Sequence, residues 1–180
     1  GIDVKIWLFA RADMVLKNPD TVARMAKAGV TSAFMGIESL NPEALREVKK
    51  GFDADVAPRA VRLLRSHGID VLGSYIIGYP CESLSDIREA AQRAREMPTS
   101  TAQFTILTPY PGTVLFDQVQ DRIVSWNWSH YDGYHCVYKP EKVSRFAVQM
   151  MLLYVHAAFY FRSSSAVKGF ARFTWRRRRG

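Results

Sequence analysis

Short apolar runs alternate with helical patterns along the first two thirds of the chain. The runs at 4–10, 30–39, 69–80 and 101–113 are rich in β-branched and aromatic residues, which is typical of buried strands. Helical patterns between them end at Gly29, at Gly68 and near Met97. This order of strands and helices predicts parallel βα units.

The expected helices carry start signals of their own. Asn18 stands before Pro19, which fits the first helical position, and a second Asn-Pro pair opens the helical pattern at 41–51. Ser83 or Ser85 is expected to cap the helix that ends near Met97. Each βα unit is therefore predicted to have a defined boundary.

The alternation stops after Thr113. Residues 114–140 are aromatic and rich in turn formers, and 141–161 reads as a helix. Within 146–161 only Gln149 and His156 are polar, but a membrane span needs roughly 17 to 25 apolar residues. A helix that packs on the core is favoured, and a helix on a membrane surface is the alternative.

The net charge of +8 is concentrated at the end of the chain. Residues 162–180 contain no acid, and without their cations the formal charge is close to neutral; the cations are Arg162, Lys168, Arg172 and Arg176 to Arg179. Blocks of like charge are usually solvated tails. The alternative is contact with nucleic acid or with an anionic membrane surface.

The cysteines predict a cellular compartment, and the first residues predict where the chain begins within its domain. Cys81 and Cys136 are the only two cysteines and have no CxxC spacing, which favours a reducing, cytoplasmic compartment over a disulfide framework. The opening residues lack a signal-peptide pattern, and because Gly1 replaces an initiator Met we expect the chain to begin inside a domain.

Polar residues gather where the expected strands end, which is where parallel α/β folds place their functional groups. Glu38 follows an apolar run, and its two oxygens suit the vicinal hydroxyls of a ribose. The alternative is an acid that stabilises the next helix start or pairs with Lys49 or Lys50. Gly73 and Gly78 would let a backbone approach a ligand closely, although a buried strand that ends in a turn explains them as well.

Three segments together resemble the radical S-adenosylmethionine superfamily. They are "AGVTSAFMGIESLNPEALREVKKG", "GIDVLGSYIIGYPCES" and "TILTPYPGT", and the resemblance runs from residue 1 to about 162. It is greatest to members with a cobalamin-binding domain, such as anaerobic magnesium-protoporphyrin ester cyclases and hopanoid-modifying enzymes. The stretch "SHYDGYHCVYKPEKVS" resembles the segment that follows the barrel in those groups.

The resemblance implies roles for individual residues. Glu38 would bind the ribose of S-adenosylmethionine, and Lys50 would bind its carboxylate with help from Arg11. For Lys50 the alternative is a solvated lysine at a helix end. The full set implied to contact the cofactor is Arg11, Gly36, Glu38, Ser39, Lys50, Ile76, Ile77, Gly78, Thr108 and Tyr110.

The implied fold class is α/β, the later half of a partial (β/α)6 TIM-like barrel with a C-terminal helical extension. Residues 1–125 would form the barrel part, 126–162 an aromatic segment and helix packed on it, and 163–180 a disordered basic tail. The family's [4Fe–4S] cluster is held by three thiolates of a CxxxCxxC loop, which this chain lacks. The cluster ligands, the missing N-terminal half of the barrel and a cobalamin domain are expected upstream.

The implied activity is radical chemistry on a small-molecule substrate by a longer parent protein. The parent would cleave S-adenosylmethionine to a 5′-deoxyadenosyl radical for hydrogen abstraction, methylation or cyclisation, while this chain alone is expected to be inactive. The aromatic block 126–138 suits a large apolar or tetrapyrrole-like substrate, or simply packs over the barrel mouth.

Two other functions compete with this one. The first is a cluster-free binding module that uses the basic tail for nucleic acid or anionic membrane. The second is an acid–base TIM-barrel enzyme built on Glu38 with His67 or His130, although His67 stands where histidines often interact with a helix end.

Overall fold

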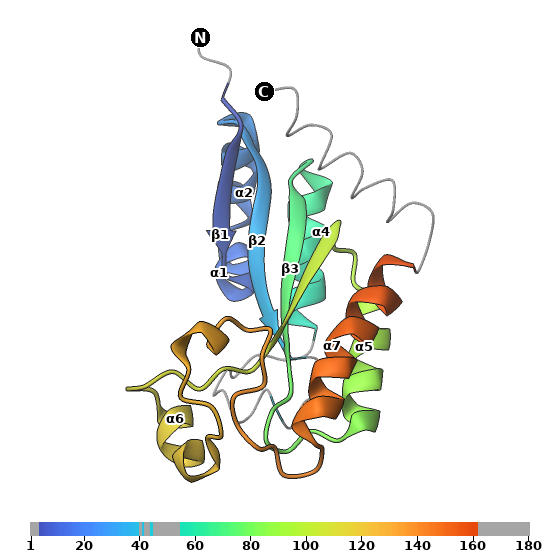
Figure 1. Ribbon diagram of the computed structural model, residues 1–180. Coiled ribbons are helices and arrows are strands. Elements are labelled where there is room, and N and C mark those ends of the chain that lie inside the picture. Colours follow the sequence, from blue (N-terminus) through green and yellow to red (C-terminus); the bar gives the residue numbers. More distant parts are fainter. Residues whose placement is uncertain (1–3, 40, 42–43, 45–54, 162–180) are drawn as a thin grey trace.

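A four-stranded parallel sheet forms the centre of the molecule (Figure 1). The computed structural model describes residues 4–39, 41, 44 and 55–161 of the 180-residue chain. The sheet order is β1-β2-β3-β4. The four predicted strands are confirmed, as β1 (Ile6–Ala10), β2 (Val30–Glu38), β3 (Asp70–Ile77) and β4 (Thr101–Ile106).

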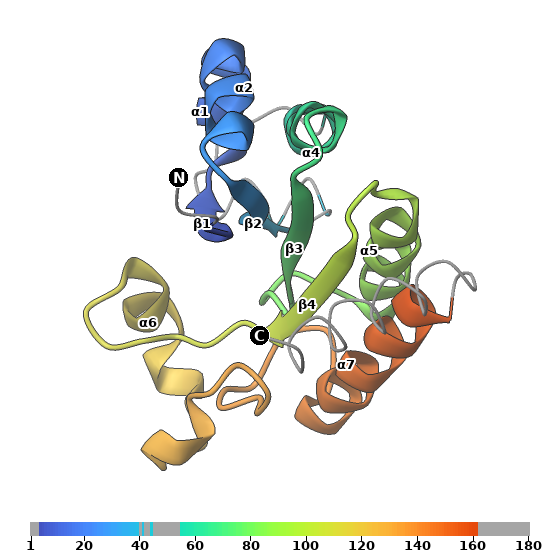
Figure 2. The same cartoon turned by 90° about the horizontal axis from the view of Figure 1, so that it is seen from above.

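Helices cover one face of this curved sheet, as the view from above shows (Figure 2). The covering helices are α1 (Ala12–Lys17), α2 (Pro19–Lys27), α4 (Val56–Ser66), α5 (Leu84–Glu96) and α7 (Arg145–Tyr160). The short helix α6 (Val114–Val119) and two 3₁₀ turns, Gln120–Arg122 and Trp128–His130, lie in the segment between β4 and α7. The α/β arrangement agrees with one side of a parallel barrel.

The observed N-caps agree only in part with the caps predicted from the sequence. Ser83 caps α5 in a capping box with Asp86, as one of the two predicted alternatives required. Asn18 precedes α2, but its side-chain amide donates to the Met14 carbonyl at 3.0 Å and does not cap α2. That bond closes α1, a helix that the sequence pattern did not indicate because it is short and directly follows a strand.

Strand alternation separates a buried outer face from a half-open inner face. In β2 and β3 the buried positions Met35, Ile37, Val71 and Ile77 point toward the helices. The same hydrophobic core continues into α7, where Val148 is also buried. The segment after β4 therefore shares one core with the sheet.

The two edges of the sheet differ. Along β4, the Ile106 N–H donates to the Gly133 carbonyl at 2.6 Å, and the Tyr160 hydroxyl of α7 donates to the Ala102 carbonyl at 2.7 Å. Along β1, Phe9 is 73% exposed and forms an edge-to-face cluster with Trp7 and Phe34. Within the described residues, β1 pairs with β2 alone.

The apolar helix expected at 141–161 forms as α7, with Ser144 as its N-cap. It packs against β4 and α5. Among the described residues, neither α7 nor any other helix combines the length and hydrophobicity needed to cross a membrane.

Candidate functional site

The tip of β2 holds the most unusual backbone in the described part of the chain. Glu38 has φ of 69°, and it is the only non-glycine residue described there with positive φ. The register between β2 and β3 shifts between Gly36 and Glu38, so a bulge presents the glutamate at the strand end. A left-handed conformation costs a non-glycine residue roughly 1–2 kcal/mol, and such strain concentrates at ligand sites.

Ser39 secures the turn after this tip. Its side chain is buried, and its hydroxyl accepts the Asn41 N–H at 2.9 Å. Ser39 is therefore engaged in the local turn that follows Glu38.

The loop after β3 is built around a buried carboxylate. Glu82 is 1% exposed, and its Oε2 accepts the N–H of Gly78 at 2.7 Å and of Tyr79 at 3.1 Å. Charge-assisted bonds of this kind are stronger than bonds between neutral groups. Glu82 thereby fixes the backbone at the carboxyl end of β3.

Two elements from later in the chain also hold Gly78. The hydroxyl of the fully buried Tyr138 donates to the Gly78 carbonyl, and a Cβ on Gly78 would lie 2.8 Å from Val148 Cγ1. Gly78 also has φ of 81°, which favours glycine. Sequence reasoning missed Tyr138, because a contact across 60 positions leaves no local signal.

Ile76 and Ile77 point to opposite faces. Ile76 is half-buried on the inner face, whereas the Ile77 side chain is buried in the core among the helices. A ligand on the inner face can therefore contact only the backbone of Ile77. Gly73 serves packing, because a Cβ there would lie 2.9 Å from Ile37 and from Tyr75.

The remaining expected cofactor residues lie at the same end of the sheet or outside the described part. Arg11 directly follows β1 and contacts the Asp13 carboxylate at 3.2 Å. Its hydrogen bond lowers the pKa of Asp13. Thr108 follows β4 and donates to the Ile106 carbonyl at 3.1 Å. Lys50 and the segment 45–54 lie outside the described residues.

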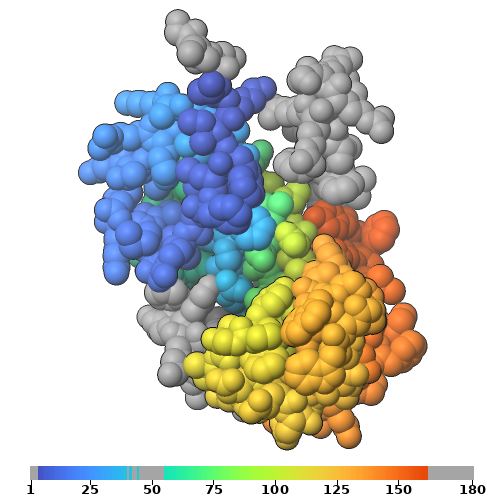
Figure 3. All heavy atoms as spheres, turned by 60° about the vertical axis from the view of Figure 1, so that its left-hand side comes forward, coloured from blue at the N-terminus to red at the C-terminus, as the bar shows by residue number. Residues whose placement is uncertain are grey.

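The segment between β4 and α7 forms one block at the carboxyl end of the strands (Figure 3). A series of ring contacts runs through it, and Trp126 and Trp128 are more than half exposed. We call this series the aromatic shelf: Phe116, Trp126, Trp128, Tyr131 and Tyr110. The Tyr110 hydroxyl donates to the Tyr131 carbonyl at 2.9 Å and ties the shelf to the end of β4.

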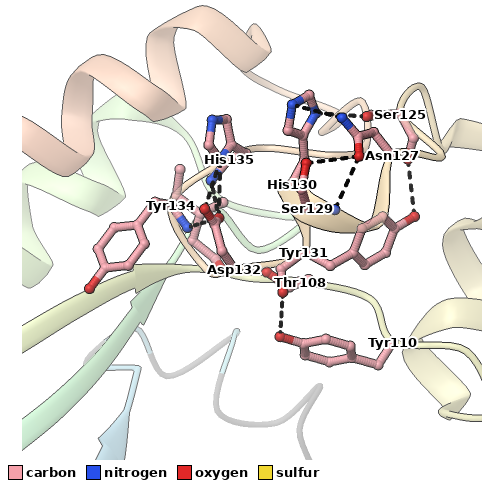
Figure 4. A network of polar contacts seen from close by, with 11 residues as sticks. Thr108, Tyr110, Ser125, Asn127, Ser129, His130, Tyr131, Asp132, Tyr134 and His135 are labelled. Carbon is pink, nitrogen blue, oxygen red and sulfur yellow. Dashed lines mark hydrogen bonds and ion pairs between the residues drawn. The ribbon is translucent and has the colours of Figure 1, made fainter.

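A polar network adjoins the aromatic shelf (Figure 4). The rings of His130 and His135 stack with centroids 4.6 Å apart, and His135 Nδ1 lies 3.0 Å from an Asp132 oxygen. Partial burial raises the pKa of Asp132, but hydrogen bonds from Tyr134 and His135 outweigh it, so the net shift is downward. Sequence reasoning named His130 but missed the Asp132–His135 pair.

An acid–base enzyme built on Glu38 would need a nearby histidine, and His67 is excluded as that partner. His67 ends α4 and contacts the Leu63 carbonyl through Nδ1 at 3.0 Å. It precedes β3 and so lies at the amino end of the sheet, whereas Glu38 lies at the carboxyl end. The two residues are therefore not brought together.

The residues present do not fit an iron–sulfur cluster. The cluster needs three thiolates, and this chain has only Cys81 and Cys136, both buried. Burial raises the pKa of the Cys136 thiol, which donates to the Tyr138 carbonyl at 3.2 Å. Over the described ranges, no group of three histidine, cysteine or acidic side chains is placed to hold a metal ion.

The same end of the sheet does fit a nucleoside. A carboxylate on a strained strand tip can accept two ribose hydroxyls, and Ile76 offers a half-buried apolar surface for a purine ring. Glu82 and Tyr138 hold the neighbouring Gly78 backbone in a fixed geometry. The site is therefore rigid on the β3 side.

Comparison with known proteins identifies relatives of this chain. An uncharacterized methyltransferase of Pyrococcus horikoshii is 28% identical over 93% of this chain and 37% of its own length. The bacteriochlorophyllide d C-12(1)-methyltransferase of Chlorobaculum tepidum is 30% identical over 71% of this chain and 28% of its own length. The chain thus spans well under half of the length of these two relatives.

A solved structure shows the same fold. The radical S-adenosylmethionine methyltransferase TsrM from Kitasatospora setae, determined with cobalamin and a [4Fe–4S] cluster bound, superposes with a TM-score of 0.58 at 18% identity. The superposition covers 66% of this chain and 22% of that one. The family model for the radical SAM superfamily matches residues 3–94, half of the sequence. The chain belongs to the radical SAM superfamily.

Proposed function

We propose that this chain is the later half of a radical SAM catalytic barrel and that it holds the nucleoside part of S-adenosylmethionine. The observation that carries the proposal is the backbone of Glu38, a strained acid at the tip of β2 in a parallel sheet. The cluster ligands would stand in another part of a longer protein, because Cys81 and Cys136 do not fit that role.

Each side of the site would bind a different part of the cofactor. Glu38 accepts the two ribose hydroxyls, and Ile76 with the backbone of Ile77 and Gly78 lines the adenine. Arg11 and Lys50 supply cations for the methionine carboxylate. Gly36, Ser39, Thr108 and Tyr110 border the same strand ends.

The protein part of the mechanism is positioning. A cluster bound elsewhere in the parent protein would supply the electron for reductive cleavage of S-adenosylmethionine. This chain's residues hold the ribose and adenine in one orientation, because reaction with a substrate needs the reacting atoms about 3–3.5 Å apart. Glu82 and Tyr138 act indirectly, through the Gly78 backbone that both of them hold.

We further propose that the substrate is a small molecule with a large apolar ring system, transformed by methylation or cyclisation. The aromatic shelf supports this proposal because it exposes Trp126 and Trp128 at the carboxyl end of the strands. One relative acts on a bacteriochlorophyllide, according to its name. A cobalamin domain in the parent protein is consistent with the cobalamin bound in the similar solved structure.

Formation of 5′-deoxyadenosine tests the proposed function. The full-length protein, reconstituted anaerobically with iron and sulfide and given a reductant, is expected to release deoxyadenosine from S-adenosylmethionine. Glu38→Gln should lower the rate at least tenfold, because the neutral amide accepts hydroxyl protons less strongly. Glu141→Gln, an exposed glutamate beyond the site, should leave it unchanged. Absence of deoxyadenosine from the wild-type protein would contradict the proposal.

A further inference from the structure

Helix α7 has a second apolar face that the sheet does not cover. Its buried side consists of Val148, Met151, Leu152, Val155 and Phe159. A separate set of large apolar side chains is exposed along the same helix and at its C-cap, and we call it the α7 stripe: Phe146, Met150, Leu153, Tyr154 and Phe161. Leu153 is 64% exposed.

The stripe is continuous along the helix axis. At about 100° per residue, its five side chains fall within an arc of about 100°, and the buried set is centred on the opposite side. A surface helix normally presents charged or polar groups there. Instead, the polar residues Gln149 and His156 stand to one side of the stripe, and His156 Nδ1 contacts the Leu152 carbonyl at 2.8 Å.

Completion of the barrel would not cover this stripe. The uncovered strand edge is at β1, whereas α7 packs on β4 and α5 at the other end of the sheet (Figures 1 and 2). Strands added beside β1 would extend the sheet away from α7. The stripe therefore needs an occupant of another kind.

The charges that surround the stripe in the sequence are all positive. Glu141 is the last acid of the chain, and the residues after it include Lys142, Arg145 and the cations of 162–180. The Arg145 Nε donates to the Cys136 carbonyl at 2.8 Å, at the first turn of α7. An apolar stripe next to a strongly basic segment is complementary to a surface that is apolar beneath and anionic above.

We propose that α7 docks on an anionic lipid membrane, parallel to its surface, with the α7 stripe inserted among the acyl chains. The 16 residues of α7 are too few to span a bilayer, which needs roughly 17 to 25. Nucleic acid is disfavoured as the occupant, because the stripe itself carries no cation. The basic residues that follow would contact lipid headgroups, each contributing about a fivefold gain in partitioning.

Vesicle binding by the full-length protein tests this proposal. The protein is expected to co-sediment with vesicles of phosphatidylcholine mixed with phosphatidylserine, and weakly or not at all with phosphatidylcholine alone. The double variant Phe146→Asn and Leu153→Asn should reduce partitioning at least tenfold, because burial of two large side chains is lost. Val114→Asn is the matched control: Val114 is 66% exposed but lies on α6, so partitioning should not change.

Circular dichroism of each variant verifies that α7 still folds, which is expected because both substituted positions are exposed. Replacement of Arg176 to Arg179 by glutamine should also weaken binding, and added salt should do the same. The proposal is overturned if the wild-type protein does not bind anionic vesicles, or if the double variant binds them equally well. It is also overturned if the double variant only abolishes self-association, since a second copy would then be the occupant.

Discussion

The two ends of the sheet differ in what covers them. At β4, Phe104 is 2% exposed and stacks on Tyr75 with ring centroids 4.9 Å apart, beneath α7. At β1, Phe9 is 73% exposed, although it also belongs to an aromatic cluster. Phe104 and Phe9 stand in the two edge strands and on opposite faces of the sheet, because Phe104 faces α7 whereas Phe9 is in register with Phe34 on the inner face. Later segments of the chain hydrogen-bond to β4, whereas among the described residues β1 has only β2 beside it, and we infer that a partner element covers β1.

The covered end also organises the candidate site. Glu82 and Tyr138 hold Gly78 at the end of β3 through buried hydrogen bonds. At the end of β1, Arg11 forms an ion pair with Asp13 while its own side chain is 72% exposed. We infer that the adenine side of the site is preformed and that, under the proposed function, the side next to β1 would be completed by the other part of the parent barrel.

The largest expected effect is on the free energy of unfolding, when Phe104 is truncated and the result is compared with truncation of Phe9. In the 180-residue chain, Phe104→Ala should lower the free energy of unfolding by about 3–5 kcal/mol, because it leaves a cavity in the core. Phe9→Ala should change it by less than about 0.5 kcal/mol, since the side chain is exposed. Chemical denaturation measures both. In the full-length protein Phe9→Ala should become costly, and an equal effect of Phe9→Ala in both proteins would refute a partner at β1.

A smaller loss is expected when the buried carboxylate is removed. Glu82→Ala leaves the Gly78 and Tyr79 N–H groups buried without their acceptor, which should destabilise the protein by roughly 3 kcal/mol. Glu141→Ala is the control, because this exposed glutamate pairs with Arg122 and should contribute at most about 1 kcal/mol. Comparable denaturation midpoints for the two variants would show that Glu82 does not hold the loop.

A still smaller effect is expected for the hydroxyl that links the aromatic segment to β3. Tyr138→Phe should lower the free energy of unfolding by about 1 kcal/mol and weaken S-adenosylmethionine binding, because the Gly78 carbonyl loses its donor. Tyr134→Phe, at an exposed tyrosine of the same segment, should change neither quantity. Calorimetry of unfolding and of cofactor binding distinguishes the outcomes. Unchanged affinity in Tyr138→Phe would mean that the β3 end is not preformed for adenine.

The smallest effect concerns pH. The Ser83 N–H and then the Ser83 hydroxyl bond to Asp86 and lower its pKa from the ordinary value of 3.8. A lowered folded-state pKa adds stability above the ordinary pKa, and this stability is lost as the pH falls through the folded-state value. Asp86→Asn should therefore melt below wild type at neutral pH, and the gap should shrink as the pH falls below the ordinary pKa of 3.8. A gap that persists in acid would contradict this cause.

Added salt should change the stability effects of Asp13→Asn and Asp86→Asn to different extents. Asp13 also has a lowered pKa, first through its hydrogen bond to Arg11, but the Arg11 side chain of that pair is 72% exposed to solvent. Added salt should reduce the effect of Asp13→Asn on the melting temperature more than that of Asp86→Asn, because salt screens exposed ion pairs.

The strands and the strand-tip acid were predictable from sequence because their signals are local. The apolar alternation of β2 places Glu38 at the carboxyl end of that strand. Ser83 and Asp86 have the spacing of a capping box, which is a local signal for the start of α5. The left-handed backbone of Glu38 was not predictable, because the residue type gives no indication of positive φ. The family resemblance supplied its expected role.

Long-range contacts were beyond sequence reasoning. Tyr138 appeared only as one aromatic residue among several, yet it binds the Gly78 carbonyl across 60 positions. Ile77 has the same apolar character as Ile76, and only the strand register shows that its side chain points into the core. The Asp132–His135 pair depends on a turn in which Asp132 accepts the N–H groups of Tyr134 and His135, and a Cβ on Gly133 in that turn would lie 3.2 Å from Thr105 of β4.

The central claim is that this chain binds the nucleoside of S-adenosylmethionine, while the cluster is held elsewhere in the full-length protein. Iron content and S-adenosylmethionine affinity, measured on the same reconstituted preparations, test it directly. We predict that Glu38→Gln keeps wild-type iron content but binds the cofactor at least tenfold more weakly, and that Cys81→Ser with Cys136→Ser keeps wild-type iron content. Loss of iron in the cysteine variant, or wild-type affinity in Glu38→Gln, would contradict the claim.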